Sequence, residues 1–228
     1  MQPMEDPAAI ARLIDHALLL PNLSDTELAT GCHQAAAWRV ASVCILPHWV
    51  ARCAGILHNT GVATCTVIGF PHGAHMTVVK AAEARRALDD GAQELDMVVN
   101  ISKAVSGAWR DVQADIRAVH DEVREQGAKL KVIFETCYLD ETQKIRLCEI
   151  CSEIGADWVK TSTGFGPAGA TDADVRLMRR HCAPDMQIKA SGGIRDLATV
   201  VRFRDLGCSR IGCSRTGQIL AACESKIL

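Results

Sequence analysis

The feature of this sequence that most constrains its fold is a short apolar run followed by a helix-like segment, repeated eight times. The runs are continuously apolar, which is typical of parallel strands whose sheet is covered by helices. Glycine follows several predicted helices, at Gly91, Gly127, Gly155 and Gly207, where it is favoured as a helix end. Eight such units in 228 residues fit a closed (β/α)8 barrel, the TIM barrel, better than an open doubly wound sheet.

The predicted strands are short and are separated by turn residues or helix-like segments. They span residues 12–20, 40–46, 62–70, 94–100, 130–135, 157–160, 187–189 and 209–212. A short helix over residues 7–13 is expected to cap one end of the fold, and Ser24 with Glu27 forms a capping box that starts the next helix. Since no linker or shift in composition divides the chain, we expect residues 1–228 to form one barrel domain.

The composition is that of a soluble globular protein, with 48% apolar and 23% charged residues. The formal net charge of -2 gives no sign of a nucleic acid or an anionic membrane as partner. No apolar run approaches the roughly 18 residues that a membrane-spanning helix needs. Glu5 and Asp6 lie where a secretory signal would carry basic residues, so we expect a cytoplasmic protein without a membrane partner.

The eleven cysteines do not indicate a disulfide framework, because their number is odd and no secretory signal precedes them. Several, including Cys44 and Cys65, lie inside predicted strands, where thiols behave as small hydrophobic side chains. Cys148 and Cys151 form a C-x-x-C pair, but the pair lies within a predicted helix and no second pair is near. We therefore expect no metal site and no cofactor.

Two predicted strands end in a lysine, Lys160 and Lys189, and a polar turn that contains glycine follows each of them. Burying an ammonium group is costly, and desolvation favours the neutral amine, a nucleophile that forms Schiff bases with carbonyl groups. If the two strands are neighbours, each ammonium group also disfavours the charge of the other. Alternatively, each lysine reaches solvent from the end of its strand. The occurrence of two such lysines favours a chemical role.

Further polar residues are predicted inside apolar strands whose carboxyl ends surround the mouth of the barrel, where barrel enzymes carry their reactive groups. They are Asp15 in the first strand, Cys44 in the second, Asp96 in the fourth and Glu135 in the fifth. Two lysines and two aspartates at one mouth would let one amine react covalently while the other groups move protons. Asp96 could instead be a structural carboxylate that pairs with a neighbouring cation.

The loops after the seventh and eighth strands commonly bind phosphate in such barrels, through backbone N–H groups at the start of a helix. The relevant residues here are Gly192, Gly193, Gly212 and Ser214, with Arg195 and Arg215 close by in sequence. Glycine allows close approach of the backbone, and a serine hydroxyl adds a donor. The two loops together indicate a small phosphorylated substrate.

Five segments resemble the deoxyribose-phosphate aldolase family, and the similarity extends over residues 13–220. The segments are IDH at 14–16, VIGFP at 67–71, ELDMVVN at 94–100, VKTSTGF at 159–165 and IKASGGIR at 188–195. The resemblance implies a class I aldolase that reversibly cleaves 2-deoxy-D-ribose 5-phosphate to acetaldehyde and D-glyceraldehyde 3-phosphate, without a metal, in deoxyribose catabolism.

The resemblance also implies roles for individual residues. By motif position, Lys160 matches the Schiff-base lysine of the family, Lys189 its second lysine and Asp96 its proton-relay carboxylate, and we expect Asp15 to support them. The substrate and its phosphate are expected to contact Cys44, Thr163, Gly164, Gly192, Gly193, Gly212 and Ser214.

Four positions depart from the pattern of the family. Ala17 stands where many relatives have threonine, Leu46 where a polar or aromatic residue is common, and Phe165 where some have a phosphate-binding lysine. The chain reaches Leu228 without the terminal tyrosine that some relatives fold toward the site. None of these changes touches the two lysines or Asp96, so we expect the same reaction, whereas its rate and aldehyde preference do not follow.

Two other functions are compatible with the residues. One is a different Schiff-base aldolase that acts on a ketose phosphate, and a panel of substrates would separate it from the first. The other is a barrel that binds a phosphorylated ligand without catalysis, although such a protein is expected to lose a reactive lysine and both are present here. The sequence does not determine the oligomeric state, and a homodimer is compatible with it.

Overall fold

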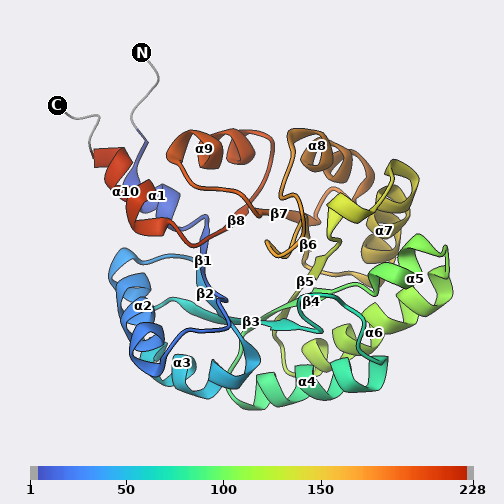
Figure 1. Ribbon diagram of the computed structural model, residues 1–228, viewed down its shortest axis with the longest axis horizontal. Helices are drawn as coiled ribbons and strands as arrows, with labels where there is room; N and C mark the ends of the chain where they lie inside the picture. The colour runs from blue at the N-terminus through green and yellow to red at the C-terminus, as the bar shows by residue number, and fades with distance from the viewer. Residues whose placement is uncertain (1–4, 225–228) are drawn as a thin grey trace.

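Eight parallel strands form a closed barrel in the computed structural model, which describes residues 5–224 of the chain (Figure 1). Each strand pairs with its neighbour in sequence, and β8 pairs with β1 to close the sheet. The strands are β1 (Ile14–Leu18), β2 (Ser42–Ile45), β3 (Ala63–Ile68), β4 (Glu94–Val98), β5 (Lys129–Ile133), β6 (Trp158–Lys160), β7 (Gln187–Ser191) and β8 (Arg210–Cys213). The predicted (β/α)8 barrel is confirmed.

Helices surround the sheet and cover its outer face (Figure 1). The α-helices are α1 (Pro7–Ala11), α2 (Asp25–Trp38), α3 (Val50–Leu57), α4 (Thr77–Asp89), α5 (Ile101–Val105), α6 (Trp109–Glu125), α7 (Glu141–Ile154), α8 (Asp172–His181), α9 (Leu197–Asp205) and α10 (Thr216–Glu224). Two short 3-10 helices, η1 (Pro47–Trp49) and η2 (Thr136–Tyr138), follow β2 and β5. The expected N-terminal helix is α1, and it packs against α10.

Local sequence signals place the ends of the helices. At the start of α2, the Glu27 N–H donates to Ser24 Oγ while the Ser24 N–H donates to Glu27 Oε2, which completes the predicted capping box. Asp140 and Gln143 form the same arrangement at α7. Gly155 ends α7 with a φ of 82°, in the left-handed region that glycine enters without steric cost.

The strand residues divide between two layers, because successive side chains of a strand point to opposite faces. In β4, Leu95 and Met97 are fully buried in the apolar core that includes helix residues. Glu94 and Asp96 of the same strand point inward and pair with the Lys131 side chain of β5. The main apolar core therefore lies between the sheet and the helices, while the interior of the barrel holds charged groups and a small apolar cluster of Leu19, Cys44, Cys65 and Val67.

Several strands end earlier than the sequence predicted. Glu135 was predicted in the fifth strand, but β5 ends at Ile133, and Glu135 lies in the loop before η2 with a φ of 56°. Likewise β4 ends at Val98, two residues before the Asn100 side chain caps α5. The apolar runs overestimated the strands because loop residues at the mouth of the barrel, such as Phe134, are also fully buried.

The sequence also led us to expect no membrane-spanning helix and no terminal tyrosine. In the stretch from residue 5 to residue 224, no helix is both long and apolar enough to span a bilayer. Leu228, at which the terminal tyrosine of some relatives is missing, lies outside the described residues.

Candidate active site

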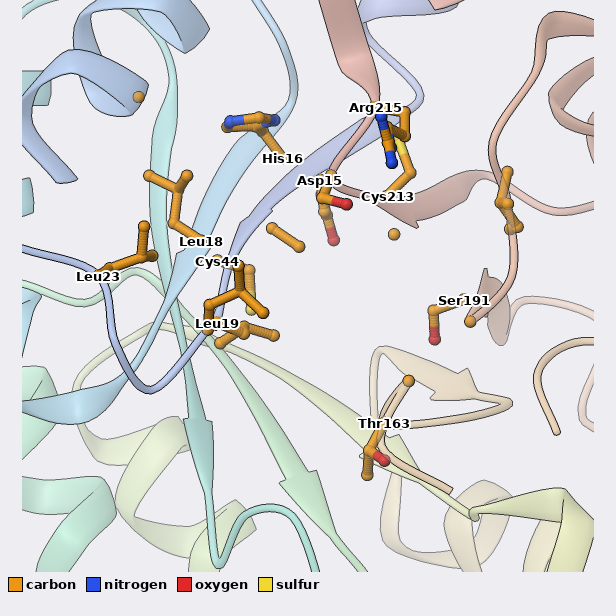
Figure 2. A pocket seen from close by; sticks show the side chains of 18 of the residues that line it. Asp15, His16, Leu18, Leu19, Leu23, Cys44, Thr163, Ser191, Cys213 and Arg215 are labelled. Atoms are coloured by element: carbon orange, nitrogen blue, oxygen red, sulfur yellow. The ribbon is translucent and has the colours of Figure 1, made fainter. Parts of the chain in front are cut away.

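A cavity of about 720 Å³ opens at the carboxyl ends of the strands, and Figure 2 shows Asp15, Thr163 and Ser191 around it. Most of the predicted site residues line this cavity: Asp15, Cys44, Lys160, Thr163, Gly164, Lys189, Gly192, Gly193, Gly212 and Ser214. Asp96 is fully buried and bonds to both lysines. The fold therefore brings all of the predicted site residues to one end of the barrel.

Lys160 and Lys189 are neighbours, because they are Cα partners in the ladder of β6 and β7. Both residues are almost fully buried, with exposed fractions of 2% and 1%. Their Nζ atoms donate to the same oxygen, Asp96 Oδ2, at 2.7 Å each. A carboxylate thus lies between the two ammonium groups and compensates the charge of both.

Asp15 is the second carboxylate of the site and is fully buried on β1. Its Oδ2 lies 2.5 Å from Lys189 Nζ, and its Oδ1 accepts a hydrogen bond from Arg210 Nη1 at 2.7 Å. Lys189 therefore forms ion pairs with both aspartates, whereas Lys160 pairs with Asp96. Of the two amines, that of Lys160 is held by fewer contacts.

The charges of Lys189 and Asp96 follow from this geometry. Burial alone would lower the pKa of Lys189, but Asp15 and Asp96 raise it above its ordinary value. Burial would raise the pKa of Asp96, but the ammonium groups of Lys131, Lys160 and Lys189 hold it well below its usual range. Lys189 is therefore a cation at neutral pH. The expectation that paired lysines favour neutral amines is wrong for Lys189, because carboxylates lie between the cations.

A deeper layer of charges was missed by the sequence prediction. Lys131 Nζ donates to Glu94 Oε2 at 2.6 Å and to Asp96 Oδ1 at 2.9 Å, and Arg210 donates twice to the Glu94 carboxylate at 2.9 Å. The ring of Trp158 lies against both cations, with its centroid 5.6 Å from Lys131 Nζ and 5.0 Å from Arg210 Cζ. Glu94 lies two residues before Asp96, a spacing that puts both side chains on one face of a strand, and this alternation was the available signal.

Glu135 holds the loop that follows Lys160. The Thr163 N–H donates to Glu135 Oε1 at 3.2 Å, and the Thr163 hydroxyl donates to Glu135 Oε2. The Phe165 N–H in turn donates to Thr163 Oγ1 at 3.0 Å, and the Phe165 ring packs edge-on against Phe70 with centroids 5.3 Å apart. Thr163 therefore lines the cavity as predicted, but its hydroxyl is engaged within the loop.

Glycines shape the two loops in which the phosphate was expected. Gly192 and Gly193 have φ angles of 85° and 77°, in the left-handed region that favours glycine. At Gly212 the reason for glycine is different, because a Cβ atom there would lie 2.9 Å from Ser191 Cβ and 3.2 Å from Lys189 Cε. The missing side chain of Gly212 leaves room for Lys189 inside the barrel.

Cys44, Cys65 and Asp96 bring three potential metal ligands together, with their ligand atoms within 4.8 Å of one another. The sequence did not predict this group, because its members come from three strands. The ammonium groups of Lys160 and Lys189 already contact Asp96 Oδ2 at 2.7 Å, and like charges repel strongly in a buried site. This positive charge disfavours a metal cation beside the carboxylate, and we assign none.

The chain is similar to known proteins over nearly the whole barrel. The family model for DeoC/LacD family aldolases matches residues 9–212. The chain belongs to this aldolase family. A deoxyribose-phosphate aldolase from Rhodopirellula baltica is 52% identical over 218 residues, which cover 96% of this chain and 90% of that protein. The resemblance found in the sequence motifs is therefore confirmed.

Two further relatives are also named deoxyribose-phosphate aldolase. A deoxyribose-phosphate aldolase from Caldanaerobacter subterraneus subsp. tengcongensis is 47% identical over 206 residues, covering 90% of this chain and 89% of that one. A solved deoxyribose phosphate aldolase from Aeropyrum pernix, described as having a unique tetrameric structure, superimposes with a TM-score of 0.90 at 30% identity. That match covers 97% of this chain and 93% of the solved one.

Proposed function

We propose that this aldolase reversibly cleaves 2-deoxy-D-ribose 5-phosphate to acetaldehyde and D-glyceraldehyde 3-phosphate through a Schiff base on Lys160. Relatives that are 52% and 47% identical and are named deoxyribose-phosphate aldolase support this substrate. The observation that carries the mechanism is that the Lys160 amine lines the cavity and shares one buried carboxylate oxygen with a second lysine.

Lys160 is our choice for the nucleophile because it is the lysine with fewer ion pairs. Within residues 5–224, Lys160 pairs with Asp96 alone, whereas Lys189 pairs with Asp15 and Asp96. The interior cluster contains four basic side chains and three carboxylates, so it stays electrically balanced when one amine is neutral. The members of this cluster are Lys131, Lys160, Lys189, Arg210, Asp15, Glu94 and Asp96.

In the cleavage direction, the neutral amine of Lys160 attacks the aldehyde carbon of the open-chain sugar, and the resulting carbinolamine loses water to form an iminium. The C3 hydroxyl then loses its proton as the bond between C2 and C3 breaks. The electrons of that bond move into an enamine, and the phosphorylated aldehyde leaves. C2 gains a proton, and water releases acetaldehyde from Lys160.

Asp96 and Lys189 are proposed to move these protons, because Lys160 is covalently engaged during the reaction. Asp96 Oδ2 contacts both amines at 2.7 Å, so a proton can pass between the carboxylate and Lys189 with little movement. A water molecule is the proposed link to C2. Asp15, at 2.5 Å from Lys189 Nζ, keeps the second lysine oriented.

The phosphate is proposed to lie at the mouth of the cavity, on the backbone N–H groups of Gly192 and Gly193 and on the Ser214 hydroxyl. Ser214 is exposed and shortly precedes α10, and the N-terminus of a helix favours an anion. Arg195 and Arg215 line the same cavity and add positive charge. The sugar would then extend inward past three other lining residues, Cys44, Gly164 and Gly212.

Borohydride reduction in the presence of acetaldehyde tests the proposal, because it converts the imine to a stable ethyl group that mass spectrometry can locate. We expect the ethyl group on Lys160, and Lys160→Ala should abolish both trapping and cleavage. Lys189→Leu is the matched variant, which should lose turnover but still be trapped at Lys160. An ethyl group on Lys189 of the wild-type protein would reverse the assignment, and faster cleavage of a ketose phosphate would reject the substrate.

We further propose a cytoplasmic location and a homodimer as the smallest assembly. Every cysteine in the described part of the chain is a free thiol, which suits a reducing compartment. The Aeropyrum pernix relative is described as tetrameric, which supports self-association. Sedimentation equilibrium would measure the assembly, and a purely monomeric protein would reject it.

A further inference from the structure

Cys44 and Cys65 form a pair of thiols inside the barrel. They are Cα partners in the ladder of β2 and β3, and neighbouring strands lie about 4.8 Å apart. Disulfides usually join residues whose Cα atoms are roughly 4.4–6.8 Å apart. The two Sγ atoms lie within 4.8 Å of each other, and both side chains pack in one interior cluster with Leu19 and Val67. Side-chain rotation can therefore bring the sulfur atoms to bonding distance.

The two thiols differ in their access to the cavity. Cys44 lines it, as Figure 2 shows, whereas Cys65 is fully buried. A small oxidant that enters the cavity therefore meets Cys44 first. The neighbouring Cys65 thiol lowers the pKa of Cys44, as do the ammonium groups of Lys189 and Lys160, and together they outweigh burial and the Asp96 carboxylate, which raise it. This environment increases the fraction of thiolate, the form of cysteine that reacts with oxidants.

Cys65 is held in place by two charged partners. Its Sγ donates to Asp96 Oδ1 at 3.2 Å, and Lys131 Nζ donates to the same sulfur at 3.4 Å. Burial, the Cys44 thiol and the Asp96 carboxylate raise the pKa of Cys65, so Cys65 remains a thiol until it reacts, and the Lys131 ammonium group stabilises the sulfur as its proton leaves. Cys65, the less accessible of the two thiols, therefore lies where it can carry out the second step of a thiol oxidation, the attack on an oxidised Cys44.

We propose that Cys44 and Cys65 are a redox modification site, which hydrogen peroxide oxidises to a disulfide within the barrel. The Cys44 thiolate attacks the O–O bond and takes one oxygen to become a sulfenic acid, and the other oxygen leaves as hydroxide, which becomes water with the proton that Cys44 released. Cys65 then attacks the Cys44 sulfur, and its proton passes to the departing hydroxide, which leaves as a second water. The two thiols lose two electrons, and the peroxide gains them.

The disulfide is expected to inhibit the aldolase. It removes the Cys65 hydrogen bond from Asp96 and shifts the wall of the cavity at Cys44. This consequence rests on the function proposed above, whereas formation of the disulfide does not. A thiol reductant such as dithiothreitol restores both cysteines and with them the contact to Asp96.

Cys32 and Cys53 provide a matched control. Their Sγ atoms lie 3.5 Å apart, between α2 and α3, and both residues are fully buried. In the described part of the chain, neither thiol lines the cavity. Oxidation of the wild-type protein tests this pair, because trypsin releases residues 13–39, which contain Cys32, and residues 53–80, which contain Cys53. Proximity of two thiols alone predicts that these two peptides are joined through Cys32, whereas access through the cavity predicts that Cys44 and Cys65 alone form a disulfide.

The experiment compares the Cys53→Ala variant with the double variant Cys53→Ala/Cys65→Ala during brief exposure to hydrogen peroxide. Trypsin releases residues 40–52, which contain Cys44, and residues 53–80, which in this background contain Cys65 as their sole cysteine. Activity is expressed relative to the untreated form of each variant. Cys65→Ser replaces Cys65→Ala if the double variant does not fold.

We expect Cys53→Ala to yield the two peptides covalently joined and to lose activity about tenfold or more, as displacement of a catalytic group does, with recovery after dithiothreitol. The double variant should form no joined peptide and keep its activity over the same exposure. Absence of joined peptides, or recovery of Cys44 solely as sulfinic acid, would overturn the site. Joined peptides from a protein that lacks aldolase activity before oxidation would support the site and contradict the proposed function.

Discussion

Asp96 is the residue on which the charge balance of the site depends. Its Oδ2 contacts Lys160 and Lys189 at 2.7 Å, and its Oδ1 contacts Lys131 at 2.9 Å. One carboxylate thus serves three ammonium groups that are almost completely removed from solvent. Removal of its charge is expected to affect both proton transfer and the stability of the cluster.

Asp96→Asn should lower turnover by about 10²–10⁴-fold, the usual contribution of a general acid or base. KM should change little, because the proposed phosphate contacts remain. Exchange of acetaldehyde methyl protons into D2O isolates proton transfer at C2 and should slow in parallel. If the variant exchanges these protons at the wild-type rate while cleavage is slow, Asp96 does not belong to the proton relay.

His16 is a buried histidine beside the candidate active site. It lies next to Asp15 on β1, with Nδ1 2.8 Å from Thr216 Oγ1 and its ring edge-on to Trp38. Burial lowers the pKa of His16 from 6.5 to about 4. Between these values the unfolded chain binds a proton that the folded chain does not, so stability falls as pH falls.

Urea unfolding across this pH range should show the effect of His16, with a slope of up to about 1.4 kcal/mol per pH unit. His16→Asn keeps a polar atom near Nδ1 but cannot titrate, so its free energy of unfolding should depend less on pH in this window. An equal pH dependence in the variant and the wild type would show that another group titrates there.

Among the secondary-structure elements, β8 positions the second lysine through a glycine. A methyl group at Gly212 would lie 2.9 Å from Ser191 Cβ and 3.2 Å from Lys189 Cε. Gly212→Ala should displace Lys189 from its aspartates and lower turnover by about 10²-fold, as misplacement of a catalytic group does. Gly55→Ala in α3 is the control, because its Cβ would meet no atom within 4 Å. Equal turnover in the two variants would contradict this role of Gly212.

The segment between β8 and α10 contains Ser214, whose hydroxyl is proposed to bind the phosphate. A hydrogen bond to a charged group contributes about 1.5–3 kcal/mol, so Ser214→Ala should raise KM for the phosphorylated sugar by roughly tenfold or more. Cleavage of unphosphorylated 2-deoxyribose should be nearly unchanged. Comparable losses on both substrates would show that Ser214 serves something other than the phosphate.

The interior charge cluster joins strands from both halves of the chain. Lys131 on β5 contacts Glu94 and Asp96 and is fully buried. Lys131→Met leaves these carboxylates without one of their cations, and breaking a buried pair in this way costs about 3–5 kcal/mol. Urea unfolding should show this loss.

Lys129→Met is the matched control, two residues earlier on the same strand. Its ion pair with Asp157 is at the surface, with the Lys129 side chain 56% exposed, and such pairs contribute about 1 kcal/mol or less. If the two variants were equally stable, the buried cluster would contribute no more to the barrel than a surface ion pair.

The repeated strand and helix pattern predicted the barrel and the end of it at which the candidate site residues lie. Strand and helix patterns are local, and the carboxyl ends of parallel strands all reach one mouth. Assigning each residue to its strand in the strand–helix repeats was therefore enough to place Lys160, Lys189, Asp15 and Asp96 at one end of the fold. The strand ends were predicted less well, because buried loop residues such as Phe134 are as apolar as strand residues.

The ion pairs between strands could not be predicted from the sequence. Arg210 bonds to Asp15 across 195 positions of sequence and to Glu94 across 116. These pairings depend on closure of the sheet between β8 and β1 and on the register of neighbouring strands, neither of which a local pattern contains. The sharing of Asp96 by three lysines and the approach of Cys44 to Cys65 have the same origin. Hydrophobic periodicity specifies each strand separately, whereas the electrostatics of the site arise where several strands meet.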